Sequence, residues 1–126
     1  MFLIDTHVMI WILSDSKKIS EKARTTLDSG EKVYISIASL WEIAIKQGIG
    51  KLDLSYSIED IVSKCDAYGI SILDIKAKHL DNMKSLPDIH KDPFDRLIVS
   101  QALVEGLDLI SKDENIVKYP NVKVIW

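Results

Sequence analysis

The chain has 126 residues, 47% of them hydrophobic, and its 16 Lys and Arg against 19 Asp and Glu give a formal net charge of −3 at pH 7. This is the length of one domain, residues 1–126, and no apolar run reaches the ~20 residues that a membrane-spanning helix needs. The single cysteine, Cys65, excludes an internal disulfide, and no basic segment precedes the first apolar stretch, so we expect a cytoplasmic protein without a signal peptide.

Short apolar runs that recur along the chain predict the strands of a sheet. Each is rich in Ile, Leu and Val and is followed within a few residues by a polar or turn-forming residue. The four clearest runs are residues 2–4, 33–35, 70–73 and 107–110, and residues 122–125 are a candidate fifth.

The segments between these runs carry the end signals of helices. Ser39 precedes Glu42 by three residues and Ser57 precedes Asp60 by three, which is the spacing of a capping box. Asp92 stands before a proline, the usual order at a helix start. The predicted starts are therefore Ser20, Ser39, Ser57 and Asp92, and the predicted ends are Gly30, Gly69 and Gly106.

Strand and helix alternate through most of the chain. This order predicts an α/β fold with a mostly parallel sheet of four to five strands and helices on both of its faces. Ligands of such sheets bind beyond the carboxyl ends of the strands, where the strand order reverses. Asp5 directly follows the first strand, so its carboxylate is predicted to face that site and not the core.

Three more acids occupy similar positions, and with Asp5 they are predicted to meet at one edge. Glu42 lies near the start of the helix after the second strand, Asp95 lies in the first turn after Asp92, and Asp113 follows the fourth strand. Two such charges 4 Å apart repel by about 4 kcal/mol at an effective dielectric near 20, so four of them require cations or protons. Carboxylate oxygens favour Mg²⁺ or Mn²⁺, and an acid-only site of this kind is typical of phosphodiester chemistry. Zinc is disfavoured because no cysteine or histidine pair has ligand spacing.

Each acid also fits a local structural role when it is considered alone. The alternatives are an N-cap for Asp5, a capping box for Glu42 and for Asp95, and the start of a turn for Asp113. Residue spacing leaves these alternatives open.

Four segments of the chain resemble a known family in order and spacing: "FLIDTHVMIW", "ISIASLWEIAIKQGIGKLDL", "HKDPFDRLIVSQAL" and "DLISKDENI". They are similar to the PIN-domain family and, more narrowly, to VapC-type toxin ribonucleases of toxin–antitoxin modules. The resemblance implies a PIN-like three-layer α/β/α fold whose acidic quartet falls on Asp5, Glu42, Asp95 and Asp113. It also implies a Mg²⁺- or Mn²⁺-dependent endoribonuclease in which these four acids bind the metal and orient the attacking water. Cleavage by this route leaves 5′-phosphate and 3′-hydroxyl ends.

The family further implies an RNA substrate, a VapB-like antitoxin as inhibitor, and a homodimer or a toxin–antitoxin hetero-oligomer. Apolar stripes that include Trp11, Trp41 and Ile45 are expected to supply the core, and any part left exposed could form a groove for an antitoxin helix.

Supporting roles follow from position beside the quartet. Thr6 and Ser111 are hydroxyls placed to position a ligand or a water, and Arg96 could contact the scissile phosphate or form a surface ion pair. The sequence does not decide whether His7, His90 or Lys112 takes part.

Two other functions share this acidic, alternating pattern. In a receiver-like signalling domain, Asp74 would accept a phosphoryl group, but that reading requires paired acids after the first strand, where Thr6 and His7 stand. A non-catalytic PIN-fold binding protein is the second alternative, and the complete quartet argues against it.

Overall fold

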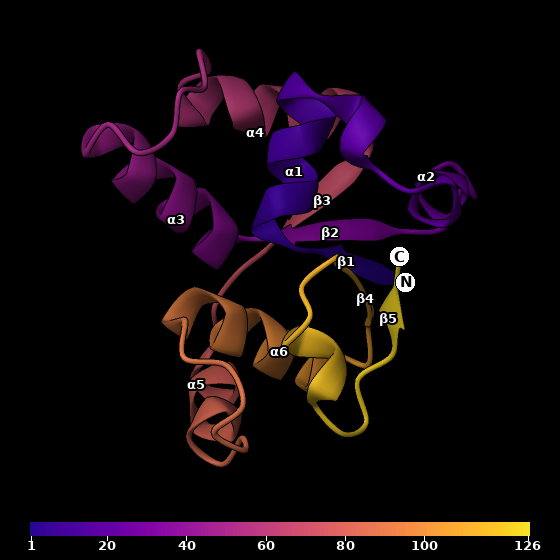
Figure 1. Ribbon diagram of the computed structural model, residues 1–126, viewed down its shortest axis with the longest axis vertical. Coiled ribbons are helices and arrows are strands. Elements are labelled where there is room, and N and C mark those ends of the chain that lie inside the picture. Colours follow the sequence, from indigo (N-terminus) through magenta and orange to yellow (C-terminus); the bar gives the residue numbers. More distant parts are fainter.

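The computed structural model of the protein describes all 126 residues and is built around a parallel five-stranded sheet (Figure 1). The strands are β1 (Phe2–Ile4), β2 (Val33–Ser36), β3 (Ile70–Leu73), β4 (Asp108–Ile110) and β5 (Val124–Ile125). Their order is β3-β2-β1-β4-β5, and every neighbouring pair is parallel. All five predicted strands are confirmed, with ends shifted by one or two residues at three of them.

Helices cover both faces of the sheet, as predicted. The helices are α1 (Thr6–Ser14), α2 (Glu21–Leu27), α3 (Ile37–Gly48), α4 (Ile58–Ala67), α5 (Ala77–Lys84) and α6 (Pro93–Glu105), with short 3₁₀ turns at Ser16–Lys18 and Ile116–Lys118. In Figure 1, α1, α3 and α4 lie on one side of the strands, and α5 and α6 lie on the other. The three-layer α/β/α arrangement is therefore confirmed.

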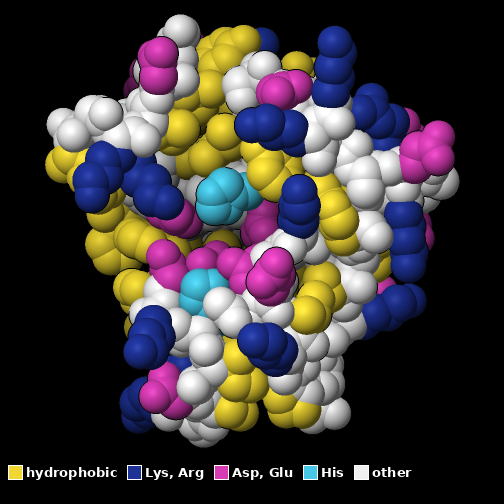
Figure 2. Space-filling view, in the orientation of Figure 1, with side chains coloured by type: hydrophobic (Ala, Val, Ile, Leu, Met, Phe, Trp, Pro, Cys, Tyr) yellow, Lys and Arg dark blue, Asp and Glu magenta, His cyan; other side chains and the backbone are white.

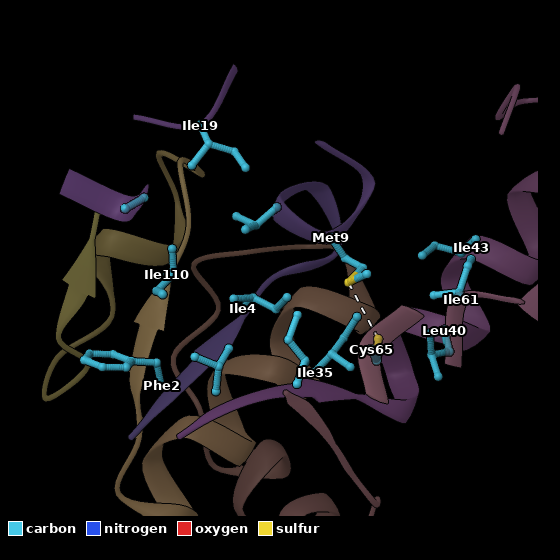
Figure 3. Close-up of a cluster of buried hydrophobic side chains, with 14 of the residues drawn as sticks. Phe2, Ile4, Met9, Ile19, Ile35, Leu40, Ile43, Ile61, Cys65 and Ile110 are labelled. Carbon is cyan, nitrogen blue, oxygen red and sulfur yellow. Dashed lines mark hydrogen bonds between the residues drawn. The ribbon is translucent and has the colours of Figure 1, made fainter. Parts of the chain in front are cut away.

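The alternation of side chains along β1 divides the core in two. Phe2 and Ile4 pack into the cluster under α1, α3 and α4, where Met9 and Cys65 also meet (Figure 3). Leu3 points the other way, into the cluster beneath α6. Because both faces of β1 are covered, all three of its residues are buried, as expected for a central strand of a parallel sheet.

Most helix ends follow the predicted signals. Ser57 and Asp60 form the capping box, Asp92 caps α6, and Gly106 ends α6 in the left-handed conformation at φ 67°. The prediction at Ser39 is wrong, because Ser36 caps α3 and Ser39 lies inside the helix, fully buried. No helix combines the length and the apolar composition needed to span a membrane.

Candidate active site

The predicted site lies where the strand order reverses. β1 is flanked by β2 on one side and by β4 on the other, so the segments that leave the carboxyl ends of β1 and β4 diverge around a common space. Figure 2 shows Asp and Glu side chains gathered around a hollow in this face, with His side chains at its border.

Asp5 uses its two carboxylate oxygens for different purposes. Oδ1 accepts a hydrogen bond from the Val8 backbone N–H at 2.9 Å and so caps α1, as the local alternative proposed. Oδ2 accepts the hydroxyl of Ser111, which comes from beyond β4. Burial of Asp5, which is 3% exposed, raises its pKa above 3.8 against the lowering effect of these hydrogen bonds.

The two carboxylate oxygens of Asp113 also have different partners. Its Oδ1 accepts the backbone N–H groups of Asn115 and Ile116 at 2.7 and 3.1 Å, which is the predicted turn role. Its Oδ2 lies 3.0 Å from His90 Nε2. Partial burial raises the pKa of Asp113, but the hydrogen bonds from His90 and the two backbone groups outweigh it and leave the pKa below 3.8.

Asp95 is brought to Asp113 by a shared contact with His90. The carboxylate Oδ2 of Asp95 lies 3.2 Å from the same His90 Nε2. Burial is the main cause that raises the pKa of Asp95 from 3.8 to about 7, and the nearby charges of Asp92, Glu42 and Asp113 add to it. At neutral pH this carboxyl can therefore hold or release a proton.

The tautomer of His90 follows from its backbone neighbours. The Asp92 backbone N–H, which can only donate, lies 3.1 Å from His90 Nδ1, so Nδ1 accepts and the proton of the neutral ring is on Nε2. The Nε2–H group therefore donates to the carboxylate of Asp113, and Asp95 Oδ2 lies 3.2 Å from the same nitrogen. Although the potential ligand atoms of His90, Asp95 and Asp113 lie within 4.8 Å of one another, this tautomer makes His90 a group that orients the two acids and not a metal ligand.

Glu42 lies in the middle of α3 and is 3% exposed. Its Oε2 pairs with Lys46 Nζ at 2.6 Å, one helical turn later, and this bond is the main cause of a raised pKa for Lys46. Its Oε1 is buried and has no hydrogen-bond partner. A buried carboxylate oxygen without a partner is costly, so it indicates a ligand that binds there.

The four predicted acids are thus linked across the site. Asp5 and Asp113 share Ser111, Asp113 and Asp95 share His90, and the charge of Glu42 acts on Asp95. A divalent cation fits this set, because the donors are carboxylate oxygens, one of them orphaned, and their mutual repulsion calls for positive charge.

Two of the predicted supporting residues, Ser111 and Thr6, make different contacts. Ser111 is placed as predicted, since it joins Asp5 to the backbone N–H of Asp113. Thr6 is buried beside the site, but its hydroxyl donates to Ser39 Oγ at 3.0 Å and so ties α1 to α3.

The structure corrects both roles suggested for Arg96. Its guanidinium donates to the carbonyls of Met83 and Pro87 at 3.2 and 3.1 Å, so it is turned away from the acids and forms no ion pair. These bonds fix the segment before α6, and Tyr119 Oη holds the same segment by accepting the His90 N–H at 2.9 Å.

Residue spacing alone did not identify the side-chain contacts that three residues make in or beside the site: His90, Lys46 and Ser39. Lys46 was detectable, because it follows Glu42 at the i,i+4 distance at which opposite charges meet on a helix. The Asp92 contact of His90 is local, two residues away, but its contact with Asp113 spans 23 residues and has no local signal.

The hollow extends from Asp5 and Asp113 over the start of α1. It has a volume of about 310 Å³ and is lined by Asp5, His7, Trp11, Lys112, Asp113 and Glu114. A larger hollow of about 500 Å³ lies among the segments before β2 and β3, at the opposite edge of the sheet, and none of the four predicted acids lines it.

Comparison with known families decides the membership of the chain. A family model for the PIN domain matches residues 2–122. The chain belongs to the PIN domain family. This confirms the resemblance predicted from the sequence and rules out the receiver-like alternative, in which exposed Asp74 after the edge strand β3 would have been the acceptor.

The chain is also similar to individual known proteins in sequence and in structure. The chain is 22% identical over 130 residues to ribonuclease VapC22 of Mycobacterium tuberculosis (strain ATCC 25618 / H37Rv), with 98% of this chain and 97% of the relative covered. It is similar in structure to VapBC2 from Rickettsia felis bound to a promoter DNA fragment, at a TM-score of 0.70 and 20% identity over 98% of this chain and 96% of that one. It is also similar to DNA-bound VapBC from Salmonella typhimurium, at a TM-score of 0.68 and 18% identity over 98% and 95% of the two chains.

Proposed function

We propose that this PIN-domain protein is a Mg²⁺- or Mn²⁺-dependent endoribonuclease that hydrolyses phosphodiester bonds of RNA. The observation that carries the proposal is the buried, unpartnered Oε1 of Glu42, in a site where Asp5, Asp95 and Asp113 also contribute carboxylates. A protein that used these acids only as helix caps would have no reason to bury a free carboxylate oxygen beside them.

The chain's own residues have distinct parts in this proposal. Asp5, Glu42, Asp95 and Asp113 would hold the cation, which when bound supplies Lewis acidity at a phosphate oxygen and activates water. Ser111 and His90 keep the carboxylates of Asp5, Asp113 and Asp95 in one orientation, so that little reorganisation is needed. In the metal-free protein the carboxyl of Asp95, whose pKa burial raises to about 7, can hold a proton that a bound cation would displace.

The test of this proposal is cleavage of single-stranded and structured RNA with Mg²⁺, Mn²⁺ or EDTA. We expect cleavage that requires the cation and falls at least about 100-fold in Asp95→Asn and Glu42→Gln. Asp74→Asn is the matched control, because Asp74 is an exposed acid at the same edge of the sheet but follows the edge strand β3. Cation-independent cleavage, or equal loss in all three variants, would refute the proposal.

We further propose that the protein acts in the cytoplasm as the toxin of a toxin–antitoxin pair. The relatives named VapC and VapBC support this partner class, and a VapB-like antitoxin would be the inhibitor. Part of the predicted apolar stripe is not absorbed by the core: Trp41 and Ile45 on α3 are 56% and 40% exposed. Such a row is suited to an amphipathic antitoxin helix, while a second copy of the chain is the alternative occupant.

The partner proposal has its own test. Expression of the protein alone should arrest growth, and co-expression with an adjacent antitoxin reading frame should restore it and yield a co-purifying complex. Trp41→Ser should weaken that complex and leave RNA cleavage intact. Harmless expression of a protein that cleaves RNA in vitro would contradict the toxin role and not the nuclease role.

A further inference from the structure

Two aromatic side chains lie on the wall of the hollow that contains Asp5 and Asp113. His7 is exposed, Trp11 follows it one turn later on α1, and their ring centroids are 5.9 Å apart at an interplanar angle of 45°. Trp126 contacts Trp11 with a centroid distance of 5.5 Å. The contact with Trp126 therefore restrains the indole of Trp11, while the exposed His7 ring remains accessible in the hollow.

The simplest structural reading of this pair is an i,i+4 contact that stabilises α1. Helix stabilisation does not explain why His7 and Trp11 lie on the side of α1 that faces the hollow. Val8 and Met9 supply the buried face of α1, and the half-buried Trp11 also packs against this core. His7 and Trp11 both line the hollow beside the acids, and His7 is exposed there. An exposed ring at the edge of a proposed catalytic site has few reasons to be there for the core.

The charges around the hollow limit how it could bind RNA. Asp5, Asp113 and Glu114 line it against a single ammonium group, that of Lys112. Lys46 and Arg96, which are close in sequence to Glu42 and Asp95, are engaged by the Glu42 carboxylate and by backbone carbonyls, respectively. Contacts from lysine or arginine side chains to phosphates are therefore few in this hollow, whereas stacking of a base on an aromatic face requires no positive charge.

We propose that His7 and Trp11 form a stacking subsite for a nucleobase of single-stranded RNA beside the scissile phosphate. Lys112 lines the same hollow and is placed to contact a neighbouring phosphate. Stacking tolerates any base, because each base has a π face, so the subsite selects unpaired nucleotides and not a particular sequence. This inference rests on the proposed ribonuclease function and adds to it the form of RNA that the site accepts.

The test uses eight-nucleotide single-stranded RNAs in which 2-aminopurine replaces one base at a time. Binding is measured with Mg²⁺ in an Asp95→Asn background, which is expected to prevent cleavage. We expect one position to lose 2-aminopurine fluorescence in the complex, as it does on stacking. Adding His7→Ala should reduce that quenching and raise the Kd about fivefold or more, since stacking contributes about 1–3 kcal/mol per base and Trp11 remains.

Two variants serve as controls. His7→Phe retains an aromatic face and should keep both the quenching and the affinity. Tyr68→Ala removes an aromatic ring that is 54% exposed at the opposite edge of the sheet, and it should change neither. Unchanged quenching and Kd in His7→Ala would overturn the subsite while leaving the nuclease proposal standing. If wild-type protein neither binds nor cleaves any of the RNAs, the proposed function itself falls.

Discussion

Replacing Asp95 by Asn tests the electrostatics of the site through protein stability alone. The carboxyl of Asp95 has its pKa raised from 3.8 to about 7 by burial and by neighbouring acids, so the folded protein binds this proton more tightly than the unfolded chain does. The stability that this proton confers is fully present below about pH 4 and is lost as the pH rises towards 7. Asparagine has no such charge, so the variant should not lose stability over the same range.

The size of the effect follows from the two pKa values. The difference between 3.8 and about 7 corresponds to about 4 kcal/mol at 1.36 kcal/mol per pH unit, and this is an upper limit because the charge of Asp95 is shared with Asp113 through His90. Urea unfolding in EDTA should show similar free energies of unfolding for wild type and Asp95→Asn near pH 4. At pH 8 the variant should be more stable by up to about 4 kcal/mol.

Divalent cation should narrow this stability difference at pH 8. A cation at 100 times its Kd stabilises a folded protein by about 2.7 kcal/mol, and wild type should receive this stabilisation while Asp95→Asn receives much less. A stability difference between the two proteins that does not change with pH would refute the assignment of a charged, buried Asp95.

Four further substitutions probe the site and the helix ends. Glu42→Gln should weaken Mn²⁺ binding, measured by calorimetry, at least tenfold while the fold is retained. The substitution removes the negative charge of the carboxylate whose Oε1 has no hydrogen-bond partner. Ser111→Ala should lower the free energy of unfolding by about 1–2 kcal/mol, since it leaves Asp5 buried with one hydrogen bond fewer. Gly106→Ala should cost about 1 kcal/mol because residue 106 has a φ of 67°. Gly48→Ala, at the last residue of α3 with nothing within 4 Å of the added Cβ, should instead stabilise the protein by up to about 0.5 kcal/mol, and thermal unfolding of the pair distinguishes them.

Signals carried by neighbouring residues predicted the fold well. The proline after Asp92, the glycine at 106 and the Ser57–Asp60 pair are local, and each marks the helix end at which it was expected. The prediction at Ser39 was wrong because α3 begins directly after β2, without a loop, and the sequence offers two serines three residues apart. Both serines are fully buried, and their partners distinguish them: Ser36 accepts the Ala38 backbone N–H and caps the helix, whereas Ser39 accepts the Thr6 hydroxyl, a contact that no local pattern reveals.

The candidate site was predictable in its acids and not in the groups around them. The strand-end rule assigns Asp5 and Asp113 to one edge without any knowledge of distances. Whether an adjacent side chain points into the site depends on tertiary partners, and Arg96 shows this: it follows Asp95 directly, yet the carbonyls of Met83 and Pro87 hold its guanidinium away. His90 is the converse, a loop residue that long-range contacts place between two acids.

Capping and metal binding were treated as alternatives for Asp5, but a carboxylate has two oxygens and can serve both. Oδ1 caps α1 and Oδ2 meets Ser111, so the bond that starts the helix also fixes the group that faces the site. Asp5→Asn keeps an oxygen for the Val8 N–H, and Asn is as good an N-cap as Asp, so the free energy of unfolding in EDTA should be little changed. Asp5→Ala loses the cap and should cost about 1–2 kcal/mol. Both variants should bind Mn²⁺ weakly, because both lack the charge; if Asp5→Asn bound Mn²⁺ as wild type does, the cap would be the whole role of Asp5.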